Sequence, residues 1–197
     1  MFPKAVFASM IVAITFPVVS VHAQEDAWTP PGPNVGATFP DVLNAPDQTG
    51  TPKTLRDLVG TQGVVVAFVR SADWCPFCMR QLVDLQRRTP EFEQLGLDVV
   101  TVSVDTVELV KKFADAQRIT YTMLADPTGA INQQLGIRDA NYPLGSKAFG
   151  VPQPGIFVLD RSRKIIGKYF VQGYRERPDL DEVLMDLRKK LKPHPST

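Results

Sequence analysis

The fold is decided by residues 64–86, which read VVVAFVRSADWCPFCMRQLVDLQ. Residues 64–69 are a continuous apolar run whose length and β-branched composition predict a strand buried on both faces. An amphipathic helical pattern runs from Pro76 to about Arg88, and proline is favoured at the first helical position. The sequence therefore places Cys75 between the end of a buried strand and the start of a helix.

Alternating strand and helix patterns continue toward the C-terminus. Residues 97–104 predict a second strand, and Asp105 with Glu108 resembles a capping box that opens a helix. Residues 121–124 predict a short strand, and a brief helix after Asp126-Pro127 can end at Gly136. Residues 156–159 and 164–170 predict an antiparallel hairpin, and residues 180–191 predict a final helix. This order predicts an α/β fold: a central mixed β-sheet flanked by helices on both faces, with a final β-hairpin and a C-terminal helix.

The two cysteines are spaced for redox chemistry. Cys75 precedes the first helical turn, where free backbone N–H groups and the helix dipole stabilise a thiolate. Cys78 follows three residues later on the same helix face, so its sulfur can reach Cys75. We therefore expect Cys75 to attack, Cys78 to resolve, and the redox-active Cys75–Cys78 disulfide to work without a cofactor.

Other roles for the cysteines fit the sequence less well. A zinc site needs four ligands, and once residues 1–23 are removed only Cys75, Cys78 and His194 are available, so no metal is expected. A purely structural disulfide over so short a loop would remove little entropy from the unfolded chain. The Trp74-Cys75-Pro76 context disfavours two unrelated buried cysteines.

The N-terminal residues predict export. Residues 1–23 combine Lys4 with an apolar run over residues 5–19, which is typical of a signal peptide cleaved after Ala23. We expect a periplasmic or secreted protein with no stable membrane insertion after cleavage, since the run is short for an uncleaved anchor. Residues 24–35 are proline-rich and predict a flexible linker, residues 36–192 form the domain, and residues 193–197 are a tail. A near-neutral charge without a Lys/Arg block excludes nucleic acid as a partner.

Residues 64–86 resemble the thioredoxin superfamily and, within it, the AhpC/TSA family of peroxiredoxin-like proteins, also called redoxins. Residues 36–40 (GATFP), Asp126-Pro127 and residues 154–160 (PGIFVLD) support the resemblance, which covers about residues 35 to 190. The resemblance implies that Pro154 is the superfamily's cis-proline beside the cysteines, and that the backbone before it, at Gln153, pairs with a substrate strand. Trp74 either shields the thiolate from water or is a large core aromatic.

The chain departs from the family at three positions. Peroxidatic members carry proline and threonine or serine where this chain has Phe68 and Ala72, and an arginine where it has Pro154. Candidate substitutes are Ser71, Arg70, Arg118 and Arg138. These departures favour disulfide exchange with protein or thiol substrates as the main hypothesis. The alternatives are a thiol-dependent peroxidase (antioxidant), with Cys75 peroxidatic, Cys78 resolving and an unidentified thiol reductant, and a redox-inactive binding domain.

Overall fold

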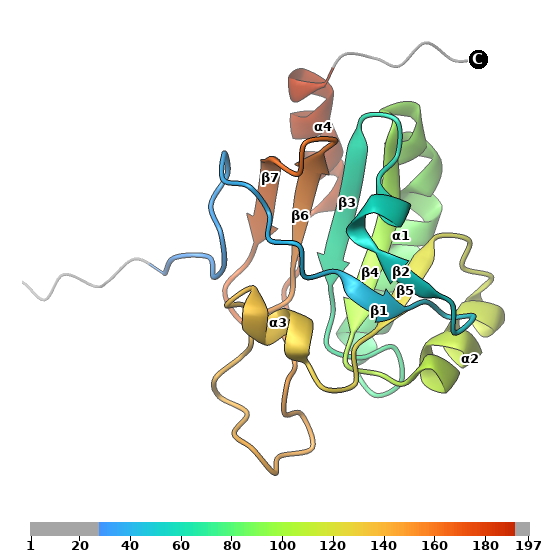
Figure 1. The fold of residues 1–197 in the computed structure, drawn as a ribbon, viewed down its shortest axis with the longest axis vertical. Coiled ribbons are helices and arrows are strands. Elements are labelled where there is room, and N and C mark those ends of the chain that lie inside the picture. The colour runs from blue at the N-terminus through green and yellow to red at the C-terminus, as the bar shows by residue number, and fades with distance from the viewer. Residues whose placement is uncertain (1–27, 192–197) are drawn as a thin grey trace, which may run out of the picture.

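A five-stranded mixed sheet forms the centre of the protein, which the computed structural model describes over residues 28–191 (Figure 1). The strand order is β5 (Thr122–Ala125), β4 (Leu97–Ser103), β3 (Gly63–Phe68), β6 (Gly155–Asp160) and β7 (Ile165–Phe170). β3 pairs parallel with β4 and antiparallel with β6. β4 and β5 are parallel, and β6 and β7 form the antiparallel hairpin that the sequence predicts.

Helices cover both faces of this sheet. The longer helices α1 (Pro76–Gln94), α2 (Val107–Gln117) and α4 (Leu180–Lys190) share one hydrophobic cluster. The short helix α3 (Ala130–Gln134) lies on the other face, together with the hairpin β1 (Asn44–Pro46) and β2 (Pro52–Thr54) and the 3-10 helix η1 (Leu55–Leu58). The predicted fold class is confirmed, whereas β1, β2 and η1 were not anticipated.

The central strand β3 connects the two layers of the core. Val65 and Ala67 belong to the cluster under α1, while Val64, Val66 and Phe68 belong to the opposite cluster. All six residues of β3 are buried, which explains their continuous apolar sequence. The strand therefore gives the following cysteine loop a rigid support.

Two helix boundaries differ from the sequence prediction. α1 continues past Arg88 to Gln94, despite Pro90, because buried Phe92 extends its apolar face into the core. α2 begins after Thr106 rather than Asp105. Asp105 is buried and engaged by the cysteine loop, so a tertiary contact has displaced the expected cap.

The part of the predicted linker that is described, residues 28–35, is anchored to the domain. Lys168 Nζ of β7 donates to the carbonyl oxygens of Pro30 and Gly32 and to Asn34 Oδ1, at 2.9, 3.0 and 3.2 Å. Gly32 has a φ of 80° and lies so close to Ile137 that a Cβ would come within 2.7 Å of its side chain. These residues therefore pack as part of the domain.

The predicted signal peptide (residues 1–23), residues 24–27 and the 193–197 tail lie outside the described residues. Within residues 28–191, no helix has the length and apolar character needed to cross a membrane.

Candidate active site

Cys75 and Cys78 form a disulfide at the N-terminus of α1, with their Cα atoms 5.2 Å apart. Cys75 is the N-cap, Pro76 occupies the first turn, and the Cys78 N–H donates to Cys75 Sγ at 3.4 Å. Cys75 is 3% exposed and Cys78 is fully buried. The structure thus brings together the two sulfurs that the spacing paired, with Cys75 facing the open end of the helix.

The loop before the disulfide is fixed by the buried carboxylate of Asp105. It accepts hydrogen bonds from Ser71 Oγ and the Ala72 N–H, both at 2.6 Å, and from Ser103 Oγ at 2.8 Å. Ser71 Oγ in turn accepts from the N–H groups of residues 73 and 74. Ser71 is therefore committed to holding the loop and does not replace the hydroxyl missing at Ala72.

Arg177, between β7 and α4, provides a cation beside the sulfurs. Its Nη2 donates to Cys78 Sγ at 3.2 Å, and its Nε donates to Gln81 Oε1 at 2.6 Å. Its Nη1 holds the carbonyl oxygens of Tyr174 and Glu176. Burial, with repulsion from Arg70 and Arg80, lowers the pKa of Arg177 to about 10, so the guanidinium stays protonated at neutral pH.

Arg70 provides a second buried cation. Its side chain is 4% exposed, and its guanidinium lies 4.6 Å from the ring centres of Tyr142 and Tyr174 and 5.3 Å from that of Trp74. Its backbone N–H donates to Cys78 Sγ at 3.4 Å, whereas its Nε has no hydrogen-bond partner among the described residues. Aromatic faces offset only part of the cost of burying a charge. The site therefore contains positive charge that no described carboxylate pairs with.

Trp74 belongs to this aromatic cage around Arg70. It is partly buried and also packs against the core cluster that contains both cysteines. Phe77 on the first turn of α1 meets Tyr174 edge to face, with ring centres 6.1 Å apart. The segment carrying Tyr174 and Arg177 thus covers the disulfide.

The cis-proline prediction is wrong, because no peptide bond within residues 28–191 is cis and Pro154 follows a trans bond. The Gln153 N–H donates to the Ile137 carbonyl at 2.7 Å, and Pro152 forms a β-bridge with Arg138. The backbone before Pro154 is thus held extended by the chain after α3, and the Gln153 N–H is not free to pair with a substrate strand.

Two other predicted substitutes have no described contact with the cysteines. Arg118 forms the C-cap of α2, and the Arg138 guanidinium lies over the Phe149 ring at 5.3 Å. Arg177, which does contact the disulfide, was missed. The only signal for it in the sequence is its place in the charged, Gly- and Pro-bounded segment GYRERP, residues 173–178.

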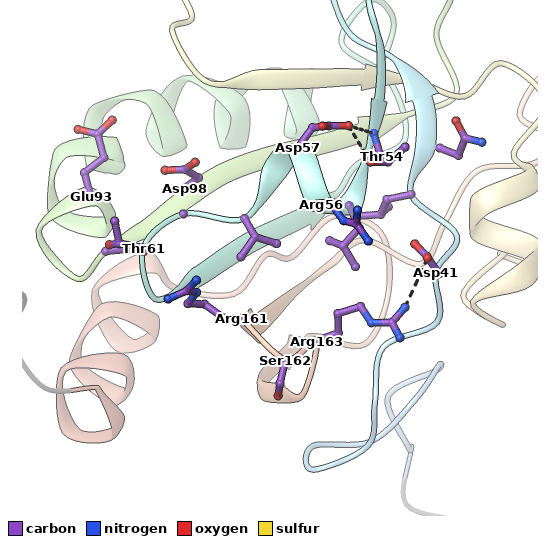
Figure 2. A pocket seen from close by; sticks show the side chains of 16 residues that line it. Asp41, Thr54, Arg56, Asp57, Thr61, Glu93, Asp98, Arg161, Ser162 and Arg163 are labelled. Atoms are coloured by element: carbon purple, nitrogen blue, oxygen red, sulfur yellow. Dashed lines mark hydrogen bonds and ion pairs between the residues drawn. The ribbon is translucent and has the colours of Figure 1, made fainter.

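A cavity of about 1630 Å³ lies away from the disulfide, and neither cysteine lines it. It lies near the start of β3 and the β6–β7 turn, at the opposite end of the sheet from the disulfide. Figure 2 shows its charged side chains, among which Arg163 pairs with Asp41 at 3.5 Å and Asp57 accepts from Thr54. Across the part of the chain that the structure describes, no three His, Cys, Asp or Glu side chains cluster as metal ligands do.

A disulfide on the first turn of a helix that follows the central strand of a mixed sheet defines a thioredoxin-fold redox protein. Residues 35–168 match the model of the AhpC/TSA family, and the chain belongs to that family. Rv1608c of Mycobacterium tuberculosis, which is named as a peroxiredoxin, is 33% identical over 131 residues, covering 66% of this chain and 81% of the relative. Peroxiredoxin bcp1 of Schizosaccharomyces pombe is 33% identical over 115 residues, covering 58% and 56%.

Solved structures agree with this assignment. Peroxidoxin BcpB from M. tuberculosis superimposes with a TM-score of 0.67 at 29% identity, covering 79% of this chain and 96% of that one. A peroxiredoxin-like protein from Aquifex aeolicus, at 22% identity, gives a TM-score of 0.68 over 81% and 88%, and supports the fold alone. The protein is a thiol-dependent oxidoreductase.

Proposed function

We propose that this protein is a thiol-dependent peroxidase that reduces hydroperoxides at Cys75. The relatives named as peroxiredoxins support this alternative better than the disulfide-exchange hypothesis that the sequence favoured. The sequence hypothesis ranked the peroxidase second because the donors expected at Ala72 and Pro154 are absent.

The reaction uses both sulfurs of the pair. The Cys75 thiolate attacks one hydroperoxide oxygen, the O–O bond breaks, and the leaving alkoxide or hydroxide takes up a proton, so that Cys75 becomes a sulfenic acid. Cys78 Sγ then attacks Cys75 Sγ, the S–O bond breaks, water leaves, and the disulfide forms. Two thiols later reduce this disulfide, which completes the cycle.

The observation that carries the proposal is the guanidinium of Arg177, 3.2 Å from Cys78 Sγ in a buried site. The attacking sulfur must be held as a thiolate, and negative charge builds up on the departing oxygen during O–O cleavage; a fixed, desolvated cation stabilises both anions. Arg70 adds a second positive charge, since it is buried beside Trp74 and has no carboxylate partner among the described residues. The two arginines thus supply, from other elements, the cationic donor missing at Pro154.

The test compares the two activities on the same protein. Reduced protein mixed with hydrogen peroxide in a stopped-flow instrument should be oxidised faster than reduced protein is oxidised by insulin disulfides at equal concentration. Cys75→Ser should abolish the peroxide reaction. Cys78→Ser should still react, and its Cys75 sulfenic acid should be captured by dimedone and identified by mass spectrometry. Faster reaction with insulin would reinstate disulfide exchange as the main function.

A further inference from the structure

A second, smaller cavity runs beside the disulfide, between the first turns of α1 and the segment that leads into α4. Its volume is about 610 Å³, which is in the range of pockets that hold small molecules. Phe77, Arg80 and Gln81 line it from α1, and Arg175 and Arg177 line it from the segment before α4. Arg177 also contacts Cys78 Sγ, so one wall of this groove reaches the disulfide.

The groove has cations that lack anionic partners. Arg87 pairs with Asp84 and Arg88 with Asp181, and Asp179 caps α4, so most of the groove's carboxylates are engaged. Arg80 and Arg175, by contrast, lie against the rings of Phe77 and Tyr174 and form no ion pair within the described part of the chain. Exposed arginines without partners at the mouth of a groove favour an anionic ligand.

A buried donor in the wall points to the same kind of ligand. Gln81 is 5% exposed, and its Oε1 accepts from Arg177 Nε, which leaves the Nε2 group as its other polar end. That Nε2 has no hydrogen-bond partner among residues 28–191. A buried amide donor without a partner is rare in folded proteins, and here it lines the same groove as the unpaired arginines.

We propose that this groove binds the carboxylate of a small anionic thiol, which is the reductant of the disulfide and attacks it at Cys75 Sγ. The inference rests on the proposed function, because that reaction forms the disulfide in each cycle. A small molecule fits the groove's volume, and a carboxylate fits its arginines and the free amide donor. Arg177 connects the groove to the disulfide through its contact with Cys78 Sγ.

The attack falls on Cys75, which is the less buried sulfur and caps the open end of α1. A thiolate of the reductant bonds to Cys75 Sγ, the Cys75–Cys78 bond breaks, and the electron pair leaves on Cys78 as a thiolate, whose Sγ lies 3.2 Å from Arg177 Nη2. A second thiolate attacks the reductant's sulfur in the mixed disulfide, which releases Cys75 and the reductant's own disulfide. Two small thiols are oxidised, and the protein disulfide is reduced.

The experiment isolates the reductive half of the cycle, with no peroxide present. Oxidised full-length protein is mixed with 3-mercaptopropionate, which is anionic, or 2-mercaptoethanol, which is neutral, and each rate is normalised to that thiol's rate with free cystine. The Arg80→Gln/Arg175→Gln double variant should lose about tenfold in rate with 3-mercaptopropionate at low salt, and less than about twofold with 2-mercaptoethanol. Arg161→Gln, an exposed arginine outside this groove, is the charge-matched control and should change neither rate.

The attacked sulfur is identified separately. Cys78→Ser protein treated with the disulfide of 3-mercaptopropionate should form a mixed disulfide at Cys75, and the double substitution should slow this reaction. An equal loss of reduction rate with both thiols, or no loss with either, overturns the groove as a binding site. Peroxide oxidation of the same reduced variants is measured in a separate experiment. If that oxidation fails but the thiol selectivity holds, the peroxidase function is wrong and the anionic-thiol site stands.

Discussion

Replacing Arg177 by glutamine is the sharpest test of the proposed chemistry. The guanidinium donates to Cys78 Sγ at 3.2 Å, and when Cys78 is a thiolate this becomes a charge-assisted hydrogen bond in a buried site. Such a bond contributes about 2 kcal/mol net, which corresponds to about 30-fold in rate when it is lost from a transition state. We expect Arg177→Gln to slow disulfide formation by about this factor, because the attacking Cys78 thiolate is less stable.

The assay separates the two oxidation steps. Reduced protein mixed with a small excess of hydrogen peroxide should show two phases in tryptophan fluorescence, since Trp74 adjoins Cys75: sulfenic acid formation, then disulfide formation. Only the first phase depends on peroxide concentration. In a Cys75→Ser background, adding Arg177→Gln should shift the thiolate absorbance titration of Cys78 to higher pH and slow its alkylation by iodoacetamide.

Two controls make the result specific. Arg177→Lys keeps the positive charge and should recover most of the second phase, although it loses the geometry that holds Gln81 and Tyr174. Arg161→Gln removes an arginine far from the sulfurs and should change nothing. If Arg177→Gln leaves both the second phase and the Cys78 titration unchanged, the argument that Arg177 stabilises the resolving thiolate is refuted.

Three further predictions concern the scaffold of the site. Asp105→Ala should lower the free energy of unfolding by about 3 kcal/mol in urea titrations and slow peroxide oxidation, because it frees the loop before Cys75 and strands the hydroxyls of Ser71 and Ser103. Stability should fall as the pH drops below about 4, because Asp47 and Asp160 have lower pKa values in the folded protein than in an unfolded chain. Burial raises both pKa values, but hydrogen bonds outweigh it: those from Thr49 lower the pKa of Asp47, and those from Ser162 lower the pKa of Asp160. Their stabilisation is thus complete above that value and is lost as the pH falls through the folded pKa, and Asp160→Asn should reduce the loss measured by urea titrations at pH 6 and pH 3. Arg70→Met should keep the urea midpoint close to wild type, since a flexible apolar side chain replaces an unpaired buried charge, yet slow the first peroxide phase by at least about tenfold.

Local chemistry explains why the disulfide could be predicted from sequence. The β-branched run of β3, the proline at the first turn of α1 and the three-residue spacing of the cysteines each act within a few residues, and all three agree. The strands β4 to β7 and the final helix were predictable for the same reason. Their hydrophobic patterns specify the element type without knowledge of the tertiary partners.

Arg70 could be named as a candidate from sequence, but neither it nor Arg177 could be placed at the sulfurs, because tertiary contacts position both side chains. Arg177 is 99 residues from the cysteine that it contacts, in an irregular segment with no period to indicate direction. The rings of Tyr142 and Tyr174, which come from two separate loops, both lie against the Arg70 guanidinium. Asp105 and Pro154 were misassigned because each fits a local pattern that a distant contact overrides. Asp105 accepts a hydrogen bond from Ser71 instead of capping α2. The backbone before Pro154 is held by the hydrogen bond from the Gln153 N–H to the Ile137 carbonyl.

The unpaired arginines also connect the two halves of the proposed cycle. A disulfide is neutral, whereas the reduced pair carries a thiolate, so Arg70 and Arg177 have an anion to interact with only in the reduced protein. Each 1.4 kcal/mol by which they favour the reduced form raises the reduction potential by about 30 mV. The same charges that prepare a thiolate for peroxide therefore make the product disulfide easier for a thiol to reduce. Loss of either arginine should accordingly slow both half-reactions, an outcome that a purely structural role for these side chains does not predict.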